Sequence, residues 1–531
     1  MAYQPVFVTL TVLIIHILFS QQKPASGKSL VNANQWCNQT PFPQVCEQSL
    51  SGHPNSGIVD QKSDFLKLAL QLALDGALRA QSTVDSLGSK CNGNKEKAAW
   101  LDCGKLYDYT ILRLNKTIHT TKCTWGDSQT WLSTALTNLE TCRAGFVELG
   151  VINHILPLML IDSVGIFIRN ALALNKLLSS KFEVEVSNRY EDDGFPDWVK
   201  PSDQKLLQQP SSSLASQANL VVAKDGSGNY KTIGEAIINA ASKWSGSGRF
   251  VILVKEGTYD EKVEIGNNLN NVMLVGDGIG KTIITGSRSV QGGYTTFNSS
   301  TVSINGDGFL SRGITYRNTA GAINQQAVAV LSLSDLSAFY ECSFEGYQDT
   351  LYVHSGRQFF RECDIYGTVD FIFGNAAVVF QKCNIYARKP IHNMNVVTAQ
   401  GRTDPNQNTG ISIHNSKVIA APELKAVQSD TIPTYLGRPW QKYSRTVFIV
   451  SYLDNLIDPA GWKEWDGNFA LDTLYYGEYG NTGDGASTKN RVTWSGYHVL
   501  NAADASKFTV ETFISGSDWL PSTGVPFDLG L

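Results

Sequence analysis

A repeat of about 20 residues runs through part of the second half of the chain, and leucine- and alanine-rich runs fill the first half. These patterns predict an all-α four-helix bundle domain followed by an all-β domain, a parallel β-helix. With 531 residues, of which 42% are hydrophobic and 17% charged, the chain has enough apolar material for both cores. The formal net charge of −4 argues against a nucleic-acid-binding protein.

The first 26 residues have the features of a secretory signal peptide. Residues 6–19 form an apolar run of 14 residues, and small residues follow it. A membrane span needs roughly 20 residues, so we expect no membrane segment after signal cleavage. A signal anchor is the alternative interpretation, since neither Lys nor Arg precedes the run.

Sequons and cysteines agree with secretion. Asn38, Asn115 and Asn298 each begin an Asn-x-Ser/Thr sequon, and we expect them to be glycosylated. Six of the nine cysteines precede residue 150, which indicates disulfides formed in an oxidising compartment. No Cys-x-x-Cys pair is present, so we do not expect a zinc site.

Residues 60–180 predict four helices with short connections. Apolar residues recur at helical spacing, with few β-branched residues among them, in the segments 65–74, 100–114, 131–149 and 156–178. We therefore expect an antiparallel bundle domain over residues 27–185.

Residues 186–215 have the composition of a linker, rich in Asp, Pro and Ser. Within it, Gln204-Lys205-Leu206-Leu207 is a candidate processing site. The strand-rich domain is expected to follow over residues 216–531.

The repeat is carried by three cysteines. Cys342-Ser-Phe-Glu-Gly-Tyr-Gln-Asp resembles Cys363-Asp-Ile-Tyr-Gly-Thr-Val-Asp, and Cys383-Asn-Ile-Tyr begins a third copy, at offsets of 21 and 20 residues. Stacking of these copies would align the three sulfurs and permit one disulfide, with Cys342–Cys363 as the candidate pair. We interpret the remaining sulfur as a buried structural thiol rather than a catalytic cysteine, because no His accompanies the group.

The same repeat aligns two carboxylates. Asp349 and Asp370 hold equivalent positions in the two copies. An aromatic residue follows three positions after each of them: Tyr352 after Asp349 and Phe373 after Asp370. Equivalent residues on adjacent coils lie about 4.7–4.9 Å apart. Two carboxylates that close repel each other and do not both ionise easily, so their pKa values should separate. One ionised and one protonated carboxyl would suit a nucleophile and a general acid. A ladder of Asp residues that merely cap solenoid turns is the alternative.

At these residues the sequence resembles the plant pectin methylesterases. The resemblance covers about residues 216–531 and implies a right-handed parallel β-helix that hydrolyses the C6 methyl esters of pectin (homogalacturonan) to pectate and methanol without a cofactor. It rests on the segments Gly257-Thr-Tyr-Asp-Glu, Gln326-Ala-Val-Ala, Gly346-Tyr-Gln-Asp-Thr-Leu-Tyr, Gly367-Thr-Val-Asp-Phe-Ile-Phe-Gly-Asn, Val397-Thr-Ala-Gln-Gly-Arg, Leu436-Gly-Arg-Pro-Trp and Trp462-Lys-Glu-Trp-Asp-Gly-Asn-Phe.

The resemblance implies a role for each matching residue. Asp370 would be the nucleophile, and Asp349 the acid that protonates methanol and then the base that activates water. Gln348 and Gln326 would donate hydrogen bonds to the oxyanion. Arg438 would hold Asp370 ionised.

The same resemblance makes Trp440, with Tyr352 and Phe373, the residues that bind the sugar. Without it, the segment from Gly437 to Trp440 would be interpreted as a rigid surface turn. The segment after Gln326 departs from the family, which often has an Arg there.

The helical part is similar to the pectin methylesterase/invertase inhibitor domain over about residues 30–185. This similarity implies the disulfides Cys37–Cys46 and Cys103–Cys142; a bridge between Cys91 and Cys123 is a further hypothesis. Together the two parts resemble plant proenzymes with an inhibitory pro region. The implied partners are pectin, proteinaceous pectin methylesterase inhibitors and a processing protease. The family usually has a dibasic motif before Leu206-Leu207, whereas only Lys205 stands here.

Other functions remain as alternatives. Two carboxylates about 5 Å apart also suit a retaining glycosidase. A lyase would additionally need a group of Ca²⁺-binding carboxylates. The chain could instead bind pectin without catalysis, or serve mainly as a source of the inhibitor domain. His354 is a candidate member of a Ser-His-Asp triad, but no Gly-x-Ser-x-Gly elbow accompanies it.

Overall fold

The computed structural model of the chain describes residues 35–51, 62–91, 93–151, 158–182, 218–244, 248–427 and 432–531. The chain divides into two compact units, Met1–Arg189 and Tyr190–Leu531. The predicted signal peptide, the linker 186–215 and the processing site within it lie outside the described residues. Within those residues, no helix has the length and apolar character that crossing a bilayer requires.

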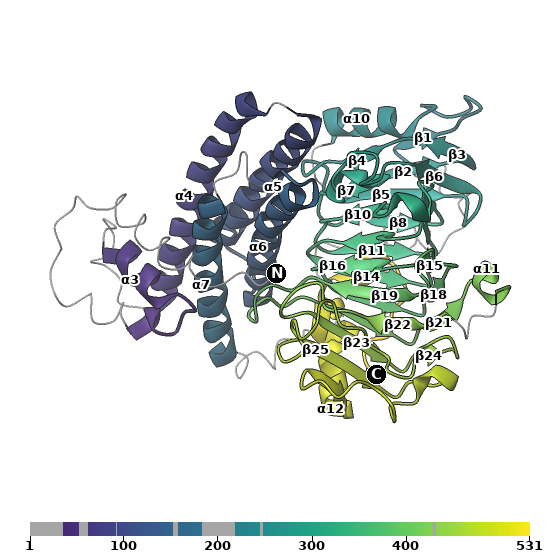
Figure 1. Ribbon diagram of the computed structural model, residues 1–531. Helices are drawn as coiled ribbons and strands as arrows, with labels where there is room; N and C mark the ends of the chain where they lie inside the picture. Colours follow the sequence, from purple (N-terminus) through teal and green to yellow (C-terminus); the bar gives the residue numbers. More distant parts are fainter. Residues whose placement is uncertain are drawn as a thin grey trace, which may run out of the picture. The chain divides into compact units, whose positions relative to one another are not determined.

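Four long helices form the first unit (Figure 1). α5 packs on α4 and α6, and α7 packs on α6 and α4, which closes the predicted four-helix bundle. Each helix is longer than the apolar segment that predicted it. α6, for example, begins before its apolar segment, at a reciprocal capping box formed by Thr124 and Asp127. The bounds are α4 Lys62–Leu87, α5 Asn94–His119, α6 Trp125–Glu148 and α7 Leu158–Phe182, with the shorter α3 at Pro43–Ser51.

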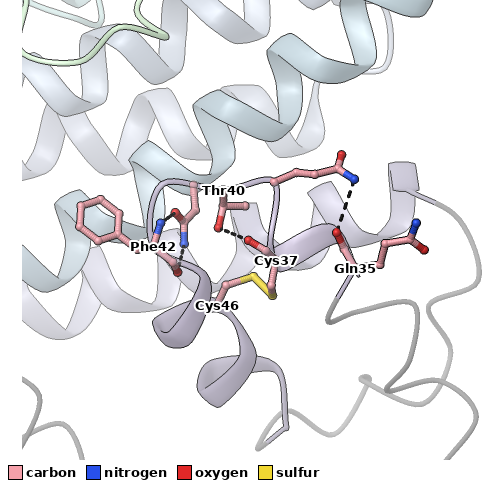
Figure 2. Close-up of a disulfide and its surroundings, with 7 residues drawn as sticks. Gln35, Cys37, Thr40, Phe42 and Cys46 are labelled. Carbon is pink, nitrogen blue, oxygen red and sulfur yellow. Dashed lines mark hydrogen bonds between the residues drawn. A yellow bond between two sulfur atoms is a disulfide. The ribbon is translucent and has the colours of Figure 1, made fainter.

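Two disulfides stabilise the first unit. Cys103 of α5 is bonded to Cys142 of α6, and Cys37 is bonded to Cys46 of α3. Figure 2 shows the Cys37–Cys46 bridge beside Phe42. The backbone N–H of Phe42 donates to the side-chain oxygen of Asn170 in α7 at 3.0 Å, and its carbonyl accepts from the side-chain nitrogen of Asn170 at 3.2 Å. Both bridges that the resemblance implies are therefore present.

Cys91 and Cys123 do not pair with each other. Both are free, partly exposed thiols that lie just beyond the two ends of α5. A helix of 26 residues is about 39 Å long at 1.5 Å per residue, far more than a disulfide can bridge. The hypothesis of a third bridge in this unit is wrong.

Three parallel sheets wind through the second unit (Figure 1). The eleven-stranded sheet contains β1 Leu220–Val222, β2 Phe250–Val254, β5 Val272–Gly276, β8 Leu310–Arg312, β11 Ser337–Tyr340, β14 Arg357–Arg361, β17 Ala377–Gln381, β20 Gly410–His414, β23 Arg445–Ile449, β25 Tyr475–Tyr479 and β26 Tyr497–Val499. The seven-stranded sheet contains β4 Val263–Ile265, β7 Val302–Ile304, β10 Val330–Ser332, β13 Leu351–Val353, β16 Ile372–Gly374, β19 Asn395–Gln400 and β22 Thr434–Gly437.

The eight-stranded sheet contains β3 Gly257–Asp260, β6 Thr282–Gly286, β9 Thr315–Asn318, β12 Ser343–Glu345, β15 Asp364–Gly367, β18 Asn384–Ala387, β21 Lys417–Ala420 and β24 Tyr452–Leu453. Short helices lie outside the sheets: α10 Ile233–Lys243, α11 Pro422–Lys425, α12 Ala502–Ala505, α13 Val510–Ile514 and α14 Gly516–Trp519. From β2 to β22 each coil contributes one strand to each sheet, and successive coils pair in parallel, so the predicted β-helix fold is confirmed.

The core is built from equivalent residues of successive coils. Phe339, Phe360 and Phe380 stack face to face with ring centroids 4.6 Å apart at each step. The pairing of Ser343 with Asp364, and of Asp364 with Asn384, places the three cysteines of the repeat in one row. The offsets of 20 and 21 residues thus correspond to one coil each.

The expected disulfide between Cys342 and Cys363 does not form; both are free thiols with no exposed surface. Paired residues of neighbouring parallel strands point their side chains in the same direction, so their Cβ atoms stay about as far apart as the strands, about 4.7–4.9 Å. The Cβ atoms of a disulfide lie closer, about 3.5–4.5 Å apart. The sulfur of Cys363 instead hydrogen-bonds the carbonyls of Phe339 and Arg361, at 3.4 and 3.3 Å. Their burial agrees with structural thiols.

Candidate active site

Asp349 and Asp370 lie at the same corner of two adjacent coils, where the chain passes from the eight-stranded to the seven-stranded sheet. The backbone N–H of Asp349 donates to the carbonyl of Val369 at 3.1 Å, which joins the two corners directly. Both aspartates have left-handed backbones, with φ of 61° and 51°. Asp is among the few residues other than Gly that adopt this region readily. We call residues 346–349 and 367–370 the two aspartate turns.

Arg438 directly follows β22 and reaches Asp370, which lies just before β16. These two strands are separated by one strand, β19, in the seven-stranded sheet. The Nε of Arg438 donates to Oδ1 of Asp370 at 2.9 Å and its Nη2 donates to Oδ2 at 2.6 Å. The backbone N–H of Arg438 is fixed by the carbonyl of Thr398 at 3.0 Å. A two-pronged guanidinium–carboxylate bond of this kind fixes both the distance and the plane of the carboxylate.

Burial and charge oppose each other at this ion pair. Asp370 is 5% exposed, and its burial raises the pKa of its carboxyl, while the hydrogen bonds and charge of Arg438 lower it. Burial disfavours the charge of Arg438, but Asp370 and then Asp349 outweigh it and raise the pKa of the guanidinium. Asp349, 7% exposed, therefore lies within electrostatic reach of the same arginine.

Three aromatic rings lie together beside the carboxylates. Tyr352 of β13 and Phe373 of β16 are paired neighbours, and their rings stack with centroids 4.2 Å apart. The indole of Trp440 meets both rings edge to face, at 6.3 and 5.9 Å. A Cβ atom on Gly401 would lie 2.8 Å from this indole, so glycine there makes room for it. Such ring clusters bury apolar sugar faces well.

The two glutamines lie on neighbouring coils. Gln348 directly precedes Asp349, and its carbonyl accepts a hydrogen bond from Ala327, the residue after Gln326, at 3.2 Å. Both glutamines are half-buried. The side-chain oxygen of Gln326 is buried without a hydrogen-bond partner in the described structure. The hydrogen bond from Ala327 brings the backbones of Gln326 and Gln348 together beside Asp349, so the two side-chain amides originate from neighbouring positions.

Sequence reasoning missed Trp465. Its ring covers the Arg438 guanidinium at 4.3 Å, and 36% of the side chain remains exposed. Lys463 holds this segment against β22, because its N–H donates to the carbonyl of Gly437 at 3.0 Å. The only available signal was the shared segment from Trp462 onward, which by itself assigns no contact to either tryptophan.

His354 is fully buried and lies against Tyr352 and Phe297, with ring centroids 5.2 and 5.9 Å apart. Desolvation lowers its pKa to about 3, so the imidazole is neutral at physiological pH. Its Nδ1 is 3.1 Å from the hydroxyl of Ser355. This environment favours a packing role over membership of a catalytic triad.

Other predicted sites are placed as follows. Asn38 is exposed, whereas Asn115 and Asn298 are half-buried, and glycosylation of all three stays a prediction. Within the described ranges, no three His, Cys, Asp or Glu side chains gather in a way that could hold a metal ion.

The chain matches two family models: "Pectinesterase" over residues 219–517, and "Plant invertase/pectin methylesterase inhibitor" over residues 32–174. "Pectinesterase 2" of Citrus sinensis is 58% identical over 517 residues, which cover 97% of this chain and 98% of that protein. "Probable pectinesterase/pectinesterase inhibitor 17" of Arabidopsis thaliana is 57% identical over 533 residues and 100% of both chains.

A solved structure, the pectin methylesterase from carrot, is similar with a TM-score of 0.58 and 57% identity. The similarity covers 59% of this chain and 98% of the carrot protein. One family model thus spans more than half of the chain, and relatives at more than half identity span nearly all of it. The chain therefore belongs to the pectinesterase family of carboxylic ester hydrolases, with an inhibitor-like domain at its N-terminal end.

Proposed function

We propose that this protein hydrolyses the C6 methyl esters of homogalacturonan in pectin, with Asp370 as the nucleophile. The observation that carries the proposal is the Asp370 carboxylate, held by both nitrogens of the Arg438 fork next to Asp349. The relatives that the chain resembles are named pectinesterases or a pectin methylesterase, which supports this substrate class.

In the first half of the reaction, a carboxylate oxygen of Asp370 attacks the ester carbonyl carbon. The carbonyl electrons move onto the oxygen, and the side-chain N–H groups of Gln348 and Gln326 stabilise that oxyanion. When the tetrahedral intermediate collapses, the bond to the methoxy oxygen breaks. Asp349 donates its proton to that oxygen and methanol leaves, so that an anhydride joins Asp370 to the sugar.

In the second half, Asp349 is ionised and takes a proton from water. The resulting hydroxide attacks the galacturonoyl carbon of the anhydride and releases the sugar as its carboxylic acid, which then loses its proton to solvent. Asp370 leaves as a carboxylate, and Asp349 holds its proton again. Arg438 favours the ionised form of Asp370 that both attacks and leaves. The cycle consumes one water and produces one acid and one methanol.

The aromatic cluster of Tyr352, Phe373 and Trp440 supplies the sugar-binding surface in this proposal. Stacked and edge-on rings bind the apolar faces of pyranose rings, and the polymer would be oriented with one ester above Asp370. Its support is the position of the cluster on the strands that follow the two aspartate turns.

We further propose that residues 1–26 direct secretion to the cell wall, 27–185 form an autoinhibitory pro region, 186–215 link the domains and 216–531 form the enzyme. The match to the inhibitor family supports the second assignment. Proteinaceous pectin methylesterase inhibitors and a processing protease are the partners this organisation suggests. Cleavage at Gln204-Lys205-Leu206-Leu207 would depend on the single basic residue there.

The direct test measures two products from highly methylated pectin. Release of methanol without chain shortening is expected, whereas new reducing ends would indicate the glycosidase or lyase that the carboxylate pair could also serve. The pectinesterase family model matches residues 219–517 alone, so residues 216–531 can be compared with the full-length chain. Lower specific activity of the full-length chain is expected; equal activity would remove the autoinhibitory role.

A further inference from the structure

Arg388 touches both aspartate turns, although it belongs to neither. It follows β18, and its backbone N–H donates to the carbonyl of Gly367 at 2.8 Å, where the turn of Asp370 begins. Its side chain continues one coil further: Nη1 donates to the carbonyl of Gly346 at 3.0 Å, where the turn of Asp349 begins. One residue therefore connects the first residues of both turns.

The guanidinium of Arg388 also covers the next residue of the Asp349 turn. Its central carbon lies 4.0 Å from the ring centroid of Tyr347. The carbonyl of Tyr347 in turn accepts hydrogen bonds from the hydroxyl of Thr350, at 3.2 Å, and from the N–H of Thr368, at 2.9 Å. Gly346 and Tyr347 are thus fixed, and Gln348 and Asp349 follow directly.

Glu423 orients Arg388 from the outside. Its carboxylate accepts a hydrogen bond from Nε of Arg388 at 2.7 Å. Burial raises the pKa of Glu423, but the hydrogen bonds to the carboxylate and the charge of Arg388 together outweigh it and lower that pKa. Glu423 lies in the first turn of α11, which is attached to the coil through the N–H of Ala421 and the carbonyl of Ala387 at 2.8 Å. With Nε occupied by Glu423, the other end of the guanidinium faces Gly346.

We propose that Arg388, oriented by Glu423, is a positioning residue for the turn that carries Gln348 and Asp349. Gln348 and Asp349 directly follow the two residues that Arg388 contacts, and a small displacement of a reacting group is enough to slow an enzyme markedly. The inference rests on the roles proposed above for Gln348 and Asp349.

A surface ion pair is the simpler interpretation. Arg388 is 24% exposed and Glu423 40% exposed, and ion pairs with such exposure stabilise proteins only slightly. The chain offers a matched control in Arg312, which is 21% exposed, bonds Glu341 through Nε at 3.0 Å and lies 5.6 Å from a tyrosine ring. It lies on the eleven-stranded sheet at the end of β8, outside the two aspartate turns.

The experiment compares R388M, R388K and R312M with wild type in the full-length chain, using kcat and KM for methyl-esterified pectin together with melting temperatures. R388M is expected to lower kcat about 10–100-fold with KM within threefold, because the reacting groups move while the sugar-binding rings do not. R388K retains a cation near Tyr347 but not the fork, so an intermediate kcat is expected. R312M is expected to stay within twofold.

A kcat of R388M within twofold of wild type would overturn the proposal, and so would an equal loss in R312M. If R388M does not fold, R388K decides: at least a threefold fall in kcat is expected, and wild-type kcat overturns the inference. The variant D349N separates this result from the proposed function. An inactive D349N with fully active R388M refutes the positioning role alone, whereas an active D349N refutes the role of Asp349 itself.

Discussion

Arg438 binds both carboxylate oxygens of Asp370, although the two residues are 68 positions apart in the chain. Parallel pairing of β16 with β19 and of β19 with β22 brings the end of the third strand to the aspartate turn of the first. The cation thus opposes the burial of this carboxylate, which raises its pKa and favours the protonated form.

Loss of this cation should change the pH profile. Asp370 reacts as a carboxylate, so activity is lost as pH falls through its pKa, and Arg438 lowers that pKa. In R438M the acid limb of kcat/KM should therefore move to higher pH, by about 1 unit or more. R438K keeps the charge but not the fork, so the limb should move less while kcat falls. An unmoved acid limb in R438M would contradict this assignment of the ion pair.

Trp465 should act on the reaction through Arg438. Its ring covers one face of the guanidinium, so W465A frees the arginine to rotate and admits water to the ion pair. We expect kcat to fall about tenfold and the acid limb to move to higher pH, with W465F close to wild type. A rise in KM without either change would instead make Trp465 a sugar-binding residue.

Thiol reactivity should distinguish the two units. Cys91 and Cys123 are partly exposed, whereas Cys342, Cys363 and Cys383 are fully buried. A water-soluble thiol reagent should label two cysteines in the native protein and five after unfolding without reduction. Three or fewer labelled cysteines in the unfolded chain would indicate a further disulfide, most simply between Cys91 and Cys123 of different molecules.

The two disulfides should contribute unequally to the stability of the bundle. Cys103–Cys142 spans 39 residues and Cys37–Cys46 spans 9. On the chain-entropy account, removing the first should lower the free energy of unfolding by about 4 kcal/mol and removing the second by about 2.6 kcal/mol. Denaturant unfolding of C103A/C142A and C37A/C46A measures both. The reverse order would show that native packing, rather than loop length, decides.

The sequence predicts the features that repeat at constant spacing. The cysteines recur every 20 or 21 residues, and the coil has that length, so Asp349 and Asp370 could be aligned before any coordinates were known. Both residues lie in left-handed turns, as they would in a purely structural Asp ladder. Local conformation therefore did not separate a structural from a catalytic role.

Contacts outside the repeat could not be predicted in the same way. Arg388 and Trp465 reach their partners through side chains that cross from one coil to another, and no constant offset marks them. The expected Cys342–Cys363 bridge was wrong for a related reason: both thiols are free, and alignment on adjacent coils does not by itself bring two Cβ atoms to the spacing of a disulfide. Sequence spacing indicates which residues are neighbours, but not distances of a few tenths of an ångström.

The nucleophile is the central claim, and replacement of Asp370 tests it most directly. Methanol release from methylated pectin should be measured for D370A and D370N beside D364A, which removes a half-buried carboxylate from the strand leading into the same turn. We predict that D370A and D370N release no methanol above background while circular dichroism shows a wild-type fold, and that D364A stays active. Substantial methanol release by a folded D370A would contradict the account.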